Sequence, residues 1–129
     1  MKFRYKKYGP GILRPVTPVE VIKNDIIVPY EVLVDSGADI CIFDASLAVV
    51  LGIDLVKGER YQVSGVTGSP QYYYLHKVTL SVGGIKYTTD AGFMVMTNGA
   101  YGIVGQKGFF DKFVVKFDLK KEDLELKPR

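Results

Sequence analysis

A short apolar strand that ends at an acid is the feature that most constrains this chain. Residues 32–34 form a Val-Leu-Val run that is typical of a buried β-strand, and Asp35 follows it directly. Ser36 and Gly37 are small and allow a sharp turn, so the Asp35 carboxylate is expected at a strand end on a loop. A carboxylate taken partly out of water needs a second charge, a proton or several hydrogen bonds. We therefore expect Asp35 to have a chemical role.

The composition favours a β-protein. The 129 residues include 14 Gly, 6 Pro and 9 Tyr, and 47% of the chain is hydrophobic. β-prone residues interrupted by turn formers indicate strands joined by tight turns. The length suits one domain with its own core. We expect a single domain over residues 1–129, with residues 1–13 as an edge strand or N-terminal arm.

Charge and cysteine content exclude several classes of partner. The 17 Lys and Arg residues against 14 Asp and Glu leave a net charge of +3, which is too small an excess to indicate a nucleic-acid partner. A single cysteine forms no internal disulfide, which suits a reducing compartment. No apolar run approaches the roughly 20 residues of a membrane span, so no membrane partner is expected. A soluble cytoplasmic protein is the expectation, and secretion from a trimmed precursor stays open.

The acid loop resembles a known motif. Residues 35–39 read Asp-Ser-Gly-Ala-Asp, which is similar to the Asp-Thr/Ser-Gly-Ala-Asp motif of aspartic proteases. The short chain resembles their retropepsin branch, whose members are single-domain homodimers. The competing interpretation is an ordinary turn, in which Asp and Ser bond nearby backbone and Gly takes positive φ. The rest of the chain has to separate the two.

The segment before Asp35 reads as a hairpin. Residues 14–23 and 26–34 have β patterns on either side of the turn at 23–25. Pro15 and Pro18 predict an edge or partly unpaired strand, and Pro29 predicts a break in pairing. The Arg-Pro pair at Arg14 resembles that of retropepsins, with a slightly longer hairpin. Residues 2–6 alternate basic and aromatic side chains, which favours an exposed edge strand over a nucleic-acid patch.

A second hairpin with a small-residue tip follows. Residues 61–63 and 71–78 are β-prone arms on either side of Ser-Gly-Val-Thr-Gly-Ser-Pro at 64–70. Such a tip has little local packing and is expected to open easily. Its position resembles the retropepsin flap, in which Gly65, Val66 and Gly68 match the glycine-apolar-glycine tip. An ordinary surface hairpin is the alternative interpretation.

The third matching segment is Ile103-Val104-Gly105. It resembles the second retropepsin motif, two apolar residues and a glycine followed by a helix, here expected over 106–113. The resemblance implies that Ile103 and Val104 line the substrate cleft and that Gly105 allows close backbone approach. Gln106 stands where many members have an arginine that pairs with the residue corresponding to Asp39, and we expect its amide to bond Asp39 instead. A plain buried strand ending at a glycine is the alternative.

Other elements follow from local patterns. Asp44 is the expected N-cap of a helix over 45–51 that stops at Gly52. Strands are expected at 72–82, 85–89 and 92–96, with a Gly-Gly turn at 83–84. Residues 113–118 and 123–127 predict a closing hairpin, which extends beyond the end of retroviral members, so their dimer interface does not carry over directly.

Other catalytic chemistries are disfavoured. No Gly-x-Ser-x-Gly motif accompanies His76, the one histidine. Cys41 lies between two isoleucines and reads as an inert buried thiol instead of a nucleophile paired with His76. One His and one Cys make a zinc site within one chain improbable. We expect no metal and no cofactor.

The three motifs occur in the family's order, and together they imply a fold and a mechanism. The implied fold is all-β: a closed retropepsin-like β-barrel with a flap hairpin and one or two short helices. Catalysis needs two carboxylates, one as base on a water and one as acid. The chain has one such acid, so the resemblance implies a homodimer in which Asp35 of each copy meets at a two-fold axis and shares a proton.

The resemblance also assigns roles around the polypeptide substrate. Asp35 is catalytic, and Ser36 and Gly37 support the acid loop. The residues expected to bind substrate are Ala38, Asp39, Gly65, Val66, Gly68, Ile103 and Val104. Two alternatives stay open: a non-catalytic homodimer that binds peptides or serves as an assembly module, and a small-ligand β-barrel, which predicts a monomer.

Overall fold

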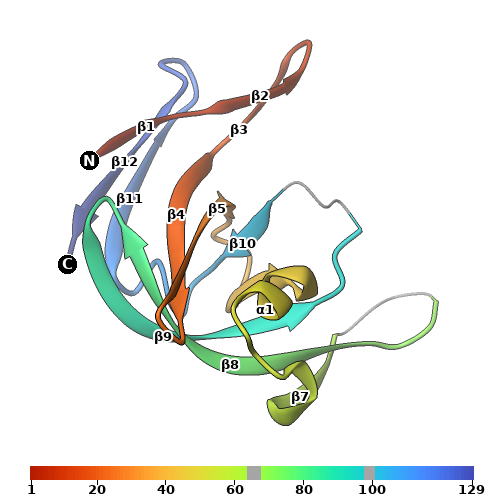
Figure 1. Cartoon of the computed structure of the whole chain (residues 1–129). Helices are drawn as coiled ribbons and strands as arrows, with labels where there is room; N and C mark the ends of the chain where they lie inside the picture. Colours follow the sequence, from red (N-terminus) through yellow and green to blue (C-terminus); the bar gives the residue numbers. More distant parts are fainter. Residues whose placement is uncertain (64–67, 98–100) are drawn as a thin grey trace.

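Strands dominate the computed structural model, which describes residues 1–63, 68–97 and 101–129. Six of them close into a barrel (Figure 1). The ring runs through β4 (Val16–Lys23), β5 (Ile26–Val34), β10 (Gly102–Val104), β6 (Cys41–Asp44), β9 (Ile85–Met94) and β8 (Gln71–Val82), and β8 pairs back with β4. The pairs β5–β10 and β6–β9 are parallel, and the other pairs of the ring are antiparallel. The all-β closed barrel expected from the sequence is confirmed.

The hairpin β4–β5 delivers the acid loop. Its turn places Asn24 and Asp25 at φ of 53° and 62°. The expected break at Pro29 is wrong, because the register runs on with Pro29 opposite Glu20. Strand β10 lies beside β5 only at residues 32–34, so the missing N–H of Pro29 is not needed by a second neighbour. The partly unpaired course expected for β4 is confirmed, since β8 pairs with it only at residues 20–22.

The long hairpin β8–β9 curves around the barrel. Gly83 and Gly84 form its turn with φ of 56° and 85°, conformations that favour glycine. The two strands expected at 85–89 and 92–96 are one continuous strand that ends at Met94. Neighbours on both sides, β8 and β6, hold β9 extended through its Asp-Ala-Gly segment, which has low β-propensity. Tertiary pairing therefore overrides the local preference.

The helices are short. Helix α1 (Ala45–Val50) buries Leu47 and Ala48, and the 3-10 helix η1 (Leu55–Lys57) follows it. Gly52, at φ 70°, ends the α1 turn as expected. No helix in the described ranges has the length and apolar character needed to cross a membrane.

Asp44 caps α1 and also fixes the end of β9. Its carboxylate accepts from the Ser46 N–H at 3.1 Å and from the Met96 N–H at 2.9 Å. Burial raises the pKa of Asp44, but the hydrogen bonds from Ser46 and Met96 outweigh it and leave the pKa below its usual value. The stabilisation is therefore present above the pKa of the unfolded chain and is lost as pH falls through the lower folded pKa.

We expect Asp44→Ala to lower the free energy of unfolding by about 1–2 kcal/mol at neutral pH, because two backbone donors lose their acceptor. The difference from wild type should shrink as the pH falls through the lowered folded pKa of Asp44, because the carboxylate is progressively protonated there. Urea denaturation at neutral pH and at a series of acidic pH values measures it. Asp54→Ala is the matched control, since Asp54 begins η1 without a side-chain cap. Equal losses in the two variants would contradict the role of the cap.

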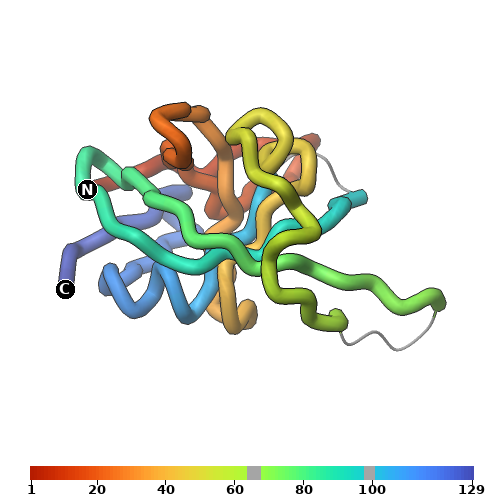
Figure 2. The backbone as a smooth tube through the Cα atoms, turned by 60° about the horizontal axis from the view of Figure 1, so that its bottom comes forward, coloured from red at the N-terminus to blue at the C-terminus, as the bar shows by residue number. Residues whose placement is uncertain are grey.

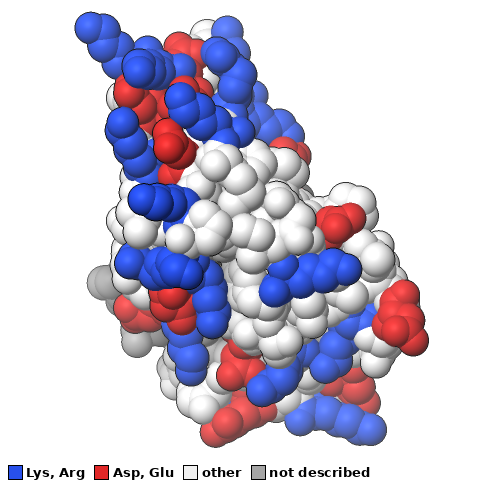
Figure 3. All heavy atoms as spheres, turned by 90° about the vertical axis from the view of Figure 1, so that its left-hand side faces the viewer, with Lys and Arg blue, Asp and Glu red and all other residues white. Residues whose placement is uncertain are grey.

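A second sheet covers one side of the barrel. It has the order β1 (Lys2–Arg4), β12 (Asp123–Pro128) and β11 (Phe113–Asp118), and β2 (Lys6–Gly9) pairs with β3 (Ile12–Arg14) in a separate hairpin. The closing hairpin is confirmed, and β1 is an edge strand that ends at Arg4, shorter than the strand expected over residues 2–6. On this side of the molecule, Lys and Arg side chains gather toward one end and around an uncharged area (Figure 3).

The chain between β10 and β11 turns without forming a helix. The helix expected over 106–113 is wrong: Gly108 has φ 101°, and the Phe110 N–H donates to the Gly105 carbonyl at 3.1 Å, a spacing longer than that of an α-helix. The fully buried Phe109 and Phe113 anchor these turns, with ring centroids 5.3 Å apart. Core packing thus fixes this segment in place of helical hydrogen bonds.

Candidate functional site

Asp35 lies at the end of the parallel pair β5–β10, in which Val34 is opposite Val104. Its N–H donates to the Val104 carbonyl at 3.0 Å. In the following turn the Gly37 N–H donates to Asp35 Oδ1 at 2.9 Å, and the Ala38 N–H donates to the Asp35 carbonyl at 3.2 Å. The turn therefore orients the carboxylate, which remains partly exposed.

Gly105 brings the chain after β10 against the acid loop. The Gln106 N–H donates to the Ala38 carbonyl at 2.8 Å, and the Lys107 N–H donates to the Asp39 carbonyl at 2.9 Å. A Cβ at Gly105 would lie 2.4 Å from the Ala38 carbonyl oxygen, which is closer than side chains approach. The close backbone approach predicted at Gly105 is confirmed. Two consecutive hydrogen bonds thus tie the acid loop to the segment after β10.

The Gln106 side chain does not bond Asp39 as we expected. Its Nε2 donates to the Ser36 carbonyl at 2.5 Å. The physical reason is local: the Gln106 backbone is fixed on Ala38, and the side chain satisfies a carbonyl of the exposed turn at 36–37. The Asp39 side chain is left exposed.

A cleft of about 550 Å³ opens beside the acid loop. Its lining is mostly apolar, with two amides, a threonine hydroxyl, a tyrosine phenol and one carboxylate: Ala38, Asp39, Ile40, Ile42, Gln62, Val63, Gln71, Tyr73, Met94, Val95, Met96, Thr97 and Ile103. These residues come from the acid loop, β6, the ends of β9 and β10, and the hairpin of β7 (Glu59–Val63) with β8. The arrangement suits an apolar ligand held by a few polar contacts.

Three of the residues predicted to bind substrate line this cleft: Ala38, Asp39 and Ile103. Val104 does not, because successive residues of a strand face opposite sides. Its side chain is fully buried in the core, and its carbonyl instead holds the Asp35 N–H.

The predicted hairpin tip is only partly described. Gly65 and Val66 lie outside the described residues. Gly68 is described, with φ 97°, and is not among the residues that line the cleft. The contact predicted between Gly68 and a substrate therefore stays a prediction.

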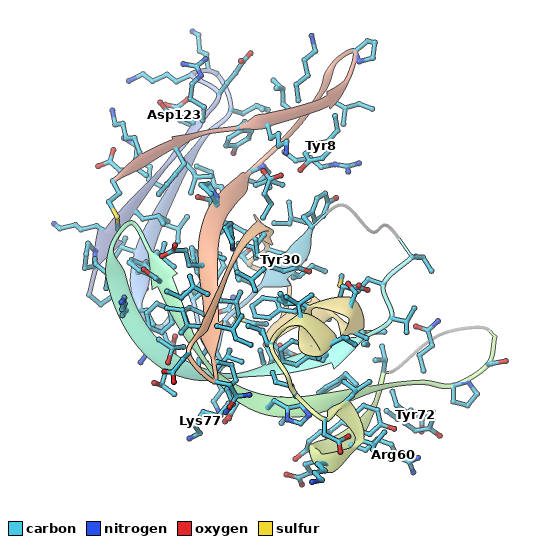
Figure 4. The ribbon with its side chains drawn as sticks, in the orientation of Figure 1. Tyr8, Tyr30, Arg60, Tyr72, Lys77 and Asp123 are labelled. Carbon is cyan, nitrogen blue, oxygen red and sulfur yellow. The ribbon has the colours of Figure 1, made fainter. Side chains whose placement is uncertain are left out.

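The arms of this hairpin are well defined. Val63 pairs with Gln71, and the arms extend away from the body on the side opposite the two termini (Figure 2). Arg60 lies over the Tyr72 ring at 4.5 Å, across the two strands (Figure 4). Tyr61 stacks on Tyr73 with ring centroids 5.5 Å apart. Cross-strand pairs therefore stiffen the arms near the cleft.

Sequence reasoning missed the part of the cleft contributed by the end of β9. We expected residues 92–96 to form a buried strand, but the strand ends at Met94, and Val95 is 75% exposed. Met94 and Met96 line the cleft. The available signal was that the apolar residues continue through Met96, two residues beyond the end of β9 at Met94.

Tyr30 joins the acid-bearing strand to the start of α1. Its hydroxyl accepts from the Asp44 N–H at 3.1 Å, and its ring meets Phe43 edge-on at 5.4 Å. It lies inside the barrel near α1 (Figure 4). Gly102 makes room for the ring, since a Cβ there would lie 2.6 Å from Tyr30 Cε2.

Arg14 links the N-terminal hairpin to the start of β10. Its Nη1 donates to the Tyr101 hydroxyl at 2.8 Å, and its guanidinium lies 5.4 Å from the Tyr8 ring centroid. The next residue, Pro15, accepts from the Val34 N–H at 2.9 Å. The Arg-Pro segment thus runs beside the strand that ends at Asp35.

Cys41 is the inert buried thiol that the sequence indicates. Its side chain is fully buried, and burial raises its pKa to about 11, so the nucleophilic thiolate is scarce at neutral pH. The ring of His76 is engaged elsewhere, with Nε2 2.7 Å from the Leu55 carbonyl oxygen. Within the described ranges, no three His, Cys, Asp or Glu residues lie together as metal ligands would.

Comparisons with known proteins agree with the motifs. The family model described as aspartyl protease matches residues 17–107. The EIAV protease in complex with the inhibitor HBY-793 is 26% identical, with a TM-score of 0.50 over 71% of this chain and 81% of that one. A retropepsin-like aspartic protease from Rickettsia conorii is 14% identical, with a TM-score of 0.68 over 98% of this chain and 89% of that one. No curated protein matches the sequence at a significant level.

Proposed function

The chain belongs to the aspartyl protease family and has the retropepsin-like fold, and on this premise we propose that it is an aspartic endopeptidase that hydrolyses peptide bonds in extended polypeptides. One observation carries the proposal. The Asp35 carboxylate accepts from the Gly37 N–H at the end of a parallel strand pair, in the acid loop whose Ala38 and Asp39 line a largely apolar cleft of about 550 Å³.

The catalytic pair requires two copies of the chain. Hydrolysis needs one carboxylate to take a proton from water and a protonated one to polarise the peptide carbonyl. Asp35 supplies one carboxylate, and Asp35 of a second copy supplies the other at a two-fold axis. Two carboxylates so close share one proton and titrate as a unit. Ser36 and Gly37, exposed in the turn, support the meeting of the two loops.

The substrate binds in an extended conformation. A peptide strand laid along the cleft offers its backbone to hydrogen bonding and its alternate side chains to the apolar lining. Ala38, Asp39 and Ile103 contact it from one side. The hairpin of β7 and β8, whose arms pair from Glu59 to Val63, would close over it as the flap that the tip at Gly65, Val66 and Gly68 predicts.

Three measurements on the purified protein test the proposal. It should cleave members of a peptide library, an aspartic-protease inhibitor should block the cleavage, and its solution mass should be that of a dimer. The pH profile of kcat/KM should be bell-shaped, because both the fully protonated and the fully ionised pair are inactive. Peptides that bind but stay intact would favour a non-catalytic peptide-binding or assembly module. A monomeric mass would favour a small-ligand barrel.

A further inference from the structure

One carboxylate sets the charge of the cleft. Among the described residues that line it, Asp39 alone has a carboxylate; the others are apolar, amide, hydroxyl or phenol side chains. Asp39 is exposed, so its charge faces the volume that a ligand would fill. The cleft is therefore apolar with one negative point.

Within one chain, no ion pair of the described residues involves Asp39. The ion pairs in residues 1–63, 68–97 and 101–129 join Lys2 to Glu125, Lys6 to Glu31 and Lys57 to Asp54. Lys107 donates its backbone N–H to the Asp39 carbonyl and forms no ion pair with the Asp39 carboxylate. The neighbouring Gln106 amide donates to the Ser36 carbonyl. Asp39 thus keeps its capacity to accept from a cation.

The positive charge of the molecule does not cancel this local field. Many Lys and Arg side chains gather on the face shown in Figure 3, away from the β7–β8 hairpin, and Arg60 of that hairpin lies over the Tyr72 ring and does not line the cleft. Interactions beyond about 10 Å are largely screened at physiological salt. The net charge of +3 therefore affects the electrostatic potential in the cleft less than the Asp39 carboxylate does.

We propose that Asp39 selects polypeptides that carry a lysine or arginine close to their apolar contact residues, and that it disfavours acidic residues there. The inference rests on the proposed function in taking the ligand to be a polypeptide substrate. Both parts of the lining contribute. Met94 and Met96 accept apolar side chains of varied shape because thioethers adapt to their neighbours, and the carboxylate adds a charge requirement that an apolar surface lacks.

The test uses one cleavable apolar peptide in three versions, with Lys, Gln or Glu at each position flanking the cleaved bond in turn. At one position we expect kcat/KM for Lys to exceed that for Gln by about three- to tenfold, as for a partly exposed ion pair, and Glu to be the poorest. Raising the salt to about 0.5 M should shrink this ratio. Equal rates for the three versions at every position would overturn the proposal.

Asp39→Asn should bring the Lys-to-Gln ratio close to one. Because the ratio compares two substrates on one protein sample, partial misfolding cancels. Asp54→Asn is the matched control: it removes the same charge from an exposed site outside the cleft and should leave the ratio as in wild type. If the Lys-to-Gln ratio of kcat/KM stays at the wild-type value in Asp39→Asn, a group other than Asp39 causes the preference for lysine.

Binding measurements separate this inference from the proposed function. The dissociation constants of the same three peptides are measured with the Asp35→Asn variant, which binds peptides without cleaving them. If wild type cleaves none of the peptides, and the Lys peptide binds more tightly than the Gln and Glu peptides, the protease proposal fails and the charge selection stands. If wild type cleaves all three peptides without charge preference, the protease proposal stands and the charge selection fails. Peptides that are neither cleaved nor bound overturn both.

Discussion

Asp35→Asn is expected to lower kcat for peptide hydrolysis by at least about a thousandfold, because an amide neither takes a proton from water nor gives one to the peptide. The amide keeps an oxygen in the place of Oδ1, which accepts from the Gly37 N–H at 2.9 Å. The free energy of unfolding should therefore stay within about 1 kcal/mol of wild type. Peptide cleavage and urea denaturation of the same sample measure both effects.

Two further results bear on this prediction. The control Asp54→Asn, an exposed acid far along the chain from the acid loop, should cleave at the wild-type rate. Refolding wild type together with about a tenfold excess of Asp35→Asn chains should lower activity per wild-type chain by about tenfold, since most wild-type chains then pair with a variant chain and form a site with one acid. Full activity of the variant, or activity that simply follows the wild-type concentration, would contradict a site built from two Asp35 residues.

Much of the fold could be predicted because local chemistry decides it. The strand before Asp35, the Asp44 cap, the glycine stop at Gly52 and the turn at Gly83 each depend on residues adjacent in sequence. The acid loop belongs to the same class. Its turn is built by hydrogen bonds from the Gly37 and Ala38 N–H groups to Asp35.

The errors arise where distant segments decide. Strand β9 continues through a segment that looks like a break, because β6 and β8 flank it. The segment after Gly105 has a helix-like pattern, but its phenylalanines are buried by the barrel core and Gly108 turns the chain at positive φ. Local propensity is a weak guide where tertiary packing supplies most of the stabilisation.

The candidate site shows the same division. Asp39 and Ile103 were found from motifs, whereas the parts of the cleft from Gln62, Tyr73 and Met96 come together only in the folded chain. Gln106 is the clearest case. Its type and position suggested Asp39 as its partner. In the folded chain the Gln106 side chain points to the Ser36 carbonyl and donates to it instead.

Gly105→Ala is expected to lower the free energy of unfolding by about 3 kcal/mol, through overpacking against rigid neighbours. The added Cβ would lie 2.4 Å from the Ala38 carbonyl oxygen and 2.7 Å from the Ile40 carbonyl oxygen. Both are backbone atoms, so no rotamer change relieves the contact. The acid loop and the segment after β10 must separate, which weakens the hydrogen bond from the Gln106 N–H to the Ala38 carbonyl. Urea denaturation measures the loss.

The control is Gly11→Ala, because an added Cβ at Gly11 meets nothing within 4 Å and only the φ of 70° opposes it. That backbone conformation should cost about 1 kcal/mol, well below the loss at Gly105. Peptide cleavage should separate the two variants further. Displacing Ala38 moves the loop that orients Asp35, so Gly105→Ala should lose activity even at temperatures where it stays folded, while Gly11→Ala keeps it. If Gly105→Ala proved as stable and as active as Gly11→Ala, close contact between the acid loop and the segment after β10 would not be what holds the carboxylate in place.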